Sequence, residues 1–198
     1  SLPIFFSNLA IPLVGIVDTG LMGHLESEKY LIAVSISTTF LTMIFWSFGF
    51  LRMGTVGLIS QALGKADYRE LVYIVLRNIL IAILISILII IFKPLLINIL
   101  NKIFDTSIQT KELINNYISI RVFSAPAELI IYVLVGFFLG VQRTFVSSCL
   151  IIILSILNIA FSIYFVKELN LDVSGVALGS LLSAYITAIV FLIYTYFF

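Results

Sequence analysis

Charged residues are scarce in this chain of 198 residues. Only 11% of them are Asp, Glu, Lys or Arg, whereas 62% are hydrophobic and the mean hydropathy is +1.22. Soluble globular domains are about half apolar and about one quarter charged, so a water-soluble fold could not bury this much apolar surface. The net charge of +1 offers no basic stripe of the kind that binds nucleic acid. The composition therefore predicts a membrane protein with no nucleic-acid partner.

Cysteine and histidine are almost absent. The single cysteine, Cys149, cannot form a disulfide within the chain, and its apolar surroundings indicate a small packing residue. His24 is the only histidine; a histidine at the end of an apolar segment is usually solvated, although it could sense pH. An intramembrane enzyme would need a paired aspartate, a Ser–His dyad or a metal cluster, and the apolar segments contain none. We expect no enzyme activity, no metal and no cofactor.

Long uncharged stretches are what the sequence has instead. About 20 residues at 1.5 Å each cross a hydrocarbon core of about 30 Å as a helix. Residues 79–92 and 150–157 are apolar almost without interruption, whereas the strands of a transmembrane barrel alternate in polarity. The sequence therefore predicts an all-α membrane protein, one six-helix bundle without a second compact domain. Its predicted helices cover residues 3–22, 31–62, 72–92, 113–139, 146–166 and 173–198.

Two stretches do not fit a single membrane-spanning helix of ordinary length. The second segment would be about 48 Å long as a helix, so we expect it to tilt strongly and to project beyond the bilayer. Residues 93–110 mix apolar side chains with Asn, Lys and Asp after Pro94, which is typical of an interfacial extension that does not span. Lys and Arg are divided almost evenly between the two sets of loops, so the positive-inside rule does not fix the orientation.

One carboxylate, Asp18, lies among Ile16, Val17 and Leu21 in the first segment. A charge in the middle of a membrane segment costs about 2.5 to 3.5 kcal/mol on insertion scales, so it usually has a function or a buried partner. Desolvation disfavours the anion, which suits a proton carrier and equally a counter-ion for a cationic substrate. Pro12, six residues earlier, can loosen the helix nearby. The alternative is that Asp18 only pairs with an arginine or caps a broken helix.

Three further charges lie inside predicted segments, and each has a structural alternative. Arg52 lies about ten residues from the end of its segment, shallow enough for its side chain to reach the interface. Arg121 lies about 12 Å and Asp18 about 6 Å from a shared face, so a direct or water-bridged pair is feasible. Glu128 follows Pro126 on roughly the same helix face as Arg121. It either carries a second proton or satisfies backbone donors freed around the proline.

Uncharged polar and small residues form stripes in three segments. Ser155, Asn158 and Ser162 recur at helical spacing, so their shared face could line a cavity or bond a neighbouring helix. Small residues that recur every four positions are typical of helix-packing seams, because they let backbones approach. Two such series are present: Gly136 and Gly140, then Gly175, Gly179, Ser183 and Thr187.

Four long stretches of this sequence carry a family resemblance. Residues 11–25, 45–67, 121–143 and 157–184 resemble the multidrug and toxic compound extrusion (MATE) family, and within it the subgroup named for DNA-damage-inducible protein F (DinF). Family members have twelve helices in two six-helix lobes around a central cavity. The resemblance therefore implies an N-terminal lobe, with the C-terminal lobe absent from this chain, so we expect a fragment or a truncated gene model.

The resemblance also implies a function and a coupling site. It implies a secondary transporter, an antiporter for multidrug efflux of cationic or amphipathic organic compounds, in a bacterial-type inner (plasma) membrane with a cytoplasmic N-terminus. The family's first-helix aspartate corresponds to Asp18 and an asparagine of its fifth helix to Asn158. Many members have an aspartate four residues after that asparagine, where this chain has Ser162.

The missing second carboxylate favours protons over sodium, since hard cations prefer several oxygen ligands including carboxylates. We therefore expect a proton site built from Asp18 and Asn158, with candidate supporting residues in Pro12, Arg121, Glu128 and Ser162. Two other functions stay open. One is a non-transporting or dimerising half-transporter, and the other is a flippase for lipid-linked substrates, which would want a more cationic cavity.

Overall fold

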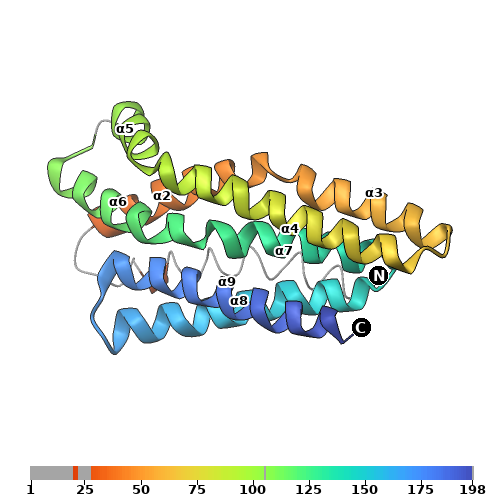
Figure 1. Cartoon of the computed structure of the whole chain (residues 1–198). Coiled ribbons are helices and arrows are strands. Elements are labelled where there is room, and N and C mark those ends of the chain that lie inside the picture. The colour runs from red at the N-terminus through yellow and green to blue at the C-terminus, as the bar shows by residue number, and fades with distance from the viewer. Residues whose placement is uncertain (1–19, 22–27, 105, 198) are drawn as a thin grey trace.

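A computed structural model describes residues 20–21, 28–104 and 106–197, and these form a bundle of long helices with no strand among them. The predicted all-α fold class is confirmed. The predicted first helix, with Pro12 and Asp18, lies outside the described residues apart from Gly20 and Leu21, and His24 also lies outside them. The long helices run side by side in Figure 1. The described α-helices are α2 (Glu28–Ser47), α3 (Phe50–Gly64), α4 (Tyr68–Ile91), α5 (Lys93–Ile103), α6 (Ile108–Arg121), α7 (Ala125–Gly140), α8 (Thr144–Lys167) and α9 (Asp172–Tyr196).

Five stretches of the described chain are long and apolar enough to cross a membrane: Glu28–Gly64, Tyr68–Ile91, Ile108–Gly140, Thr144–Lys167 and Asp172–Tyr196. The short helix α5 is not one of them. It projects from one end of the bundle (Figure 1), in the stretch for which the sequence predicts an interfacial position. Leu95, Ile99 and Ile103 are exposed on it, whereas Leu100 is buried. An amphipathic helix of this kind suits the bilayer surface.

The second span is interrupted where the sequence predicts one continuous helix. α2 ends at Ser47 and α3 begins at Phe50, with a tight turn at Phe48 and Gly49 between them. Glycine is a poor helix former, and the Ser47 hydroxyl donates to the Met43 carbonyl at 2.9 Å, a bond that often bends helices. The long segment is therefore two helices and not one continuous helix.

The span Ile108–Gly140 is also interrupted. Between α6 and α7 lies a short 3-10 helix, η1 (Val122–Ser124), which is followed by Pro126 in the first turn of α7. Proline has no N–H to donate and clashes with the carbonyl four residues earlier, here that of Val122. The tighter 3-10 turn avoids this conflict and leaves an irregular point near the middle of the span.

Helix α7 is the centre of the bundle. Eleven of its sixteen residues are buried, and it packs against α3, α4, α8 and α9. The glycine stripe on α7 faces α3 at very short range. A Cβ atom added to Gly136 would lie 2.7 Å from the Arg52 carbonyl oxygen, and one added to Gly140 would lie 2.6 Å from Ile59 Cγ2. This stripe is therefore a packing seam, as the small-residue pattern indicates.

Candidate coupling site

The polar stripe on α8 lies in the seam with α9. Ser155, Asn158 and Ser162 are all buried there. The Asn158 Nδ2 group donates a hydrogen bond to Ser180 Oγ on α9 at 2.8 Å. One turn along α8, a Cβ added to Gly179 would lie 2.7 Å from Ser162 Oγ, so only glycine allows this approach. The small residues of α9 thus place the amide and hydroxyl groups of α8 inside the bundle.

Several oxygen atoms in this seam lack a hydrogen-bond partner among the described residues. They are Asn158 Oδ1, Ser162 Oγ and Thr187 Oγ1. A buried polar atom left unbonded costs about 1 to 3 kcal/mol, and lipid offers it no substitute partner. The seam therefore retains hydrogen-bonding capacity that the described helices do not use.

The unbonded atoms of this seam belong to neutral hydrogen-bonding groups. The described residues contain no cluster of three His, Cys, Asp or Glu side chains that could hold a metal. Asn158 Oδ1 is an acceptor for a protonated carboxyl group, and the Ser162 hydroxyl is a donor to a carboxylate. Both are neutral, so they offer no charge to balance a cation. Asp18 and Pro12, the first-segment members of the expected site, lie outside the described residues.

The other two charged residues of the expected site are brought together. Arg121 Nη2 donates to Glu128 Oε1 at 2.7 Å, and the two side chains are only 16% and 15% exposed. The structure thus gives Arg121 a carboxylate partner within its own span. The pair with Asp18 that the sequence makes feasible involves a residue outside the described part. The spacing of seven residues signals the pair of Arg121 and Glu128, because it places both side chains on one helix face.

Two partners at the break between α6 and α7 were not predicted from the sequence. The Ser124 hydroxyl donates to the Arg121 carbonyl at 2.7 Å and also accepts a hydrogen bond from Arg121 Nη1. From α9, the Tyr185 hydroxyl donates to the Phe123 carbonyl at 2.9 Å. These side chains bond two backbone carbonyls at the break, whereas Glu128 bonds the Arg121 side chain. Only the proximity of Ser124 to Pro126 gives a signal in the sequence, since tyrosine in a membrane helix is common.

A second buried polar contact joins α3 and α4. Asn78 Nδ2 donates to Thr55 Oγ1 at 2.8 Å, and both side chains are buried. Arg52 lies one turn before Thr55 and is exposed, with no ion pair among the described residues. Its exposure agrees with the structural interpretation of Arg52 as a residue that reaches the interface.

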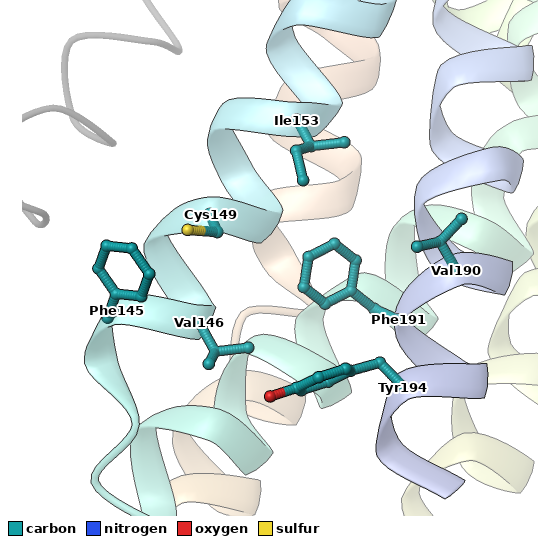
Figure 2. A pocket seen from close by; sticks show the side chains of 7 residues that line it. All are labelled: Phe145, Val146, Cys149, Ile153, Val190, Phe191 and Tyr194. Carbon is teal, nitrogen blue, oxygen red and sulfur yellow. The ribbon is translucent and has the colours of Figure 1, made fainter. Parts of the chain in front are cut away.

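The cysteine lies at an apolar groove on the surface of α8 and α9. The groove has a volume of about 240 Å³ and is lined entirely by apolar and aromatic residues (Figure 2). They are Phe145, Val146, Cys149, Ile153, Val190, Phe191 and Tyr194. No charged side chain reaches it, so it lacks the groups a coupling site needs, and Cys149 packs there as a small apolar residue.

Comparison with known proteins identifies the family. The MatE family model matches residues 3–164. The DNA damage-inducible protein F of Escherichia coli K12 is 35% identical over 190 residues, which are 96% of this chain and 41% of that protein. The multidrug export protein MepA of Staphylococcus aureus NCTC 8325 is 24% identical over 194 residues, 98% of this chain and 43% of MepA. The chain thus spans about two fifths of these relatives.

Solved structures show the same fold. A MATE transporter in complex with MaD3S superposes with a TM-score of 0.87 at 20% identity, covering 96% of this chain and 43% of that one. An outward-facing MATE transporter of the MOP superfamily gives 0.85, with 96% and 42% covered. One six-helix lobe therefore accounts for the match in each. With the family model, these similarities place the chain in a multi-pass membrane protein family, and the chain belongs to the MatE family of MATE transporters.

Proposed function

We propose that this lobe belongs to a secondary antiporter that exports cationic or amphipathic organic compounds across the inner membrane in exchange for protons. In this proposal Asp18 carries the proton and Asn158 is its hydrogen-bonding neighbour. Multidrug export is suggested by the name of the staphylococcal relatives. The observation that carries the proposal is the pair of buried oxygens, Asn158 Oδ1 and Ser162 Oγ, that lack a partner in the described chain.

The proposed cycle follows from charge. Protonation of Asp18 from outside removes its charge, allows the carboxyl group to donate to Asn158 Oδ1, and releases a cationic substrate outward. Loss of the proton to the cytoplasm restores the anion. Exchange of one monovalent cation for one proton moves no net charge, so only the pH gradient drives it, at about 1.4 kcal/mol or roughly tenfold accumulation per pH unit.

The same residues favour protons over sodium. The α8 position that could supply a second carboxylate is Ser162, which is fully buried and neutral. A sodium site would rest on amide and hydroxyl oxygens with at most one carboxylate, a weak set for a hard cation.

The alternatives are a flippase for lipid-linked substrates and a non-transporting or dimerising half-transporter. A flippase needs cationic groups for phosphate. The structure weakens that reading, because Glu128 neutralises Arg121 and leaves Arg52 as the exposed intramembrane cation of the described part. A non-transporting half-transporter would insert normally into the membrane and keep all the proposed coupling residues, but it would show no efflux.

The test is Asp18→Asn in the complete transporter, reconstituted in liposomes with an imposed pH gradient and a cationic dye. We expect dye efflux to fall to the rate of protein-free liposomes, because an amide cannot exchange the proton. The matched control is Glu112→Gln, which removes an exposed carboxylate of α6 that has no part in the proposal. Wild-type efflux by the Asp18 variant would remove Asp18 from the mechanism.

A further inference from the structure

The ion pair between Arg121 and Glu128 lies across the break between α6 and α7. We propose that Glu128 is a second proton-binding site and that the pair is a latch: uptake of one proton by the Glu128 carboxylate releases Arg121 and allows α7 to bend relative to α6. The latch rests on the proposed function only for its energy source, the proton gradient. It concerns different residues and a different step, the conformational change of the lobe.

The position of the pair is the first argument. Arg121 is the last residue of α6, Glu128 lies in the first turn of α7, and η1 with Pro126 separates them. The 2.7 Å contact therefore connects two helical segments rather than two turns of one helix. Since both side chains are largely shielded, their attraction is stronger than that of a pair in water. Loss of the charge on Glu128 would remove the strongest connection across the break.

Arg121 has other partners, so its release does not leave a bare charge in the membrane. Its guanidinium group also contacts Ser124 Oγ and interacts with Tyr117 on α6. The ring of Phe45 on α2 lies 5.6 Å from the guanidinium carbon, within the range of a cation–π contact. A protonated Glu128 is neutral and can stay in the apolar interior. Neither state of the latch therefore leaves an uncompensated charge in the low-dielectric interior.

The backbone at the break is prepared for bending. Ser124 bonds the Arg121 carbonyl, Tyr185 bonds the Phe123 carbonyl, and Pro126 has no N–H to satisfy. A change of angle here breaks few helical hydrogen bonds, because side chains already replace them. The interruption is thus a suitable hinge, and the ion pair is the contact that fixes its angle.

The charged and titratable groups around the pair come from several elements. Among the described residues, the charged or titratable side chains near the pair are Arg52 on α3, Tyr117 on α6 and Tyr132 on α7. Next to the break lie Tyr185 on α9 and Lys93 on α5, whose Nζ is 5.6 Å from the Phe123 ring centroid. The side chain from α2 is an aromatic ring, and α4 and α8 present no titratable group to the pair in this part of the chain. No second described carboxylate competes for the proton.

The latch also reaches the other interrupted span. Phe45, which packs on Arg121, lies in the last turn of α2, directly before the turn at Phe48 and Gly49. A movement of the guanidinium group therefore affects both interrupted spans. Each span can bend at its interruption without breaking a regular helix.

The test measures the hinge itself. Spin labels at Asn116, which is exposed on α6, and Gln142, just beyond α7, report the distance across the break in the full chain with Cys149→Ser in nanodiscs. We expect the distance distribution to shift as the pH is lowered. Glu128→Gln should show the low-pH distribution at every pH.

The matched control is Glu70→Gln, whose pair with Arg77 has the same spacing in the uninterrupted helix α4. It should behave as wild type. The charge-swapped variant Arg121→Glu with Glu128→Arg should fold and restore a pH-dependent distribution, because it retains the ion pair. Identical distributions for wild type and Glu128→Gln at all pH values, or a pH shift that persists in Glu128→Gln, would overturn the proposal.

The two proposals fail separately. Asp18→Asn should lose dye efflux but keep the pH-dependent distance change, since Glu128 is intact. Efflux by Asp18→Asn would refute the carrier role and leave the latch to be judged by the distances alone.

Discussion

Two Arg–Glu pairs in this chain have the same spacing of seven residues but different surroundings. Glu70 and Arg77 lie on the continuous helix α4, 3.3 Å apart, with side chains that are 45% and 61% exposed. Arg121 and Glu128 lie on either side of an interrupted span, 2.7 Å apart and about 15% exposed. The first pair runs along a surface and the second connects two segments.

This comparison shows that sequence spacing determines which side chains can form an ion pair, whereas burial determines how much that ion pair contributes to stability. Two turns of a helix cover about 10.5 Å, which two long side chains can bridge on any face. An exposed pair of this kind contributes about 0 to 1 kcal/mol and is screened by salt. A shielded pair is hardly screened, and the loss of one partner leaves a buried charge.

The largest expected effect comes from removing the carboxylate of the buried pair, and the same change in the exposed pair is the comparison. Glu128→Ala should destabilise the lobe by about 3 kcal/mol, the low end of the range for breaking a buried ion pair, because Arg121 loses its carboxylate but keeps its contacts with Ser124 and Phe45. Glu70→Ala should cost about 0 to 1 kcal/mol, and this small cost should decrease further in high salt. Denaturant unfolding in detergent micelles measures both. Equal losses would show that the two pairs do not differ in energy.

A smaller effect is expected at the hydroxyl that supports the buried pair. Ser124→Ala removes a donor to the Arg121 carbonyl and an acceptor for its guanidinium group. We expect a loss of about 1 to 3 kcal/mol, the cost of unsatisfied buried groups. Ser47→Ala is the control, because its hydroxyl bonds a backbone carbonyl at an exposed helix end. It should change stability by less than about 0.5 kcal/mol. A Ser124 variant as stable as the Ser47 variant would contradict this account.

The smallest effect is expected at the bond that α9 makes to the break. Tyr185→Phe removes only the hydroxyl that donates to the Phe123 carbonyl, so the free energy of unfolding should decrease by about 0.5 to 1.5 kcal/mol. Tyr73→Phe is the control. Tyr73 lies on the exposed face of α4 and its hydroxyl makes no hydrogen bond to another described residue, so this variant should stay within about 0.5 kcal/mol of wild type. If the two variants unfold alike, the bond to Phe123 adds no stability.

Much of the fold follows from composition and periodicity. Uncharged stretches of spanning length indicate helices, because in lipid each backbone group must be bonded within its own segment. The glycine stripe at Gly136 and Gly140 indicates a close helix contact, and the structure shows it against α3. The family resemblance is also confirmed, since long ordered strings of residues carry it.

The candidate site was only partly predictable. The shared face of Ser155, Asn158 and Ser162 follows from their spacing, but the partner of Asn158 on α9, Ser180, does not. The roles of Asp18 and Pro12 stay predictions, because these residues lie outside the described part. Arg121 and Glu128 were identified as costly charges on one face, but their ion pair was not predicted. A pair between Arg121 and Asp18 stays a prediction.

The sequence by itself determined that this protein crosses a membrane as helices and that a few charges must find partners within it. Hydropathy and helical period are local properties, so they can be read along the chain. Tertiary structure alone decided where the long spans break and which groups satisfy the breaks. Tyr185 reaches the irregular turn at Phe123 from α9, and no local pattern encodes a contact between residues 62 positions apart.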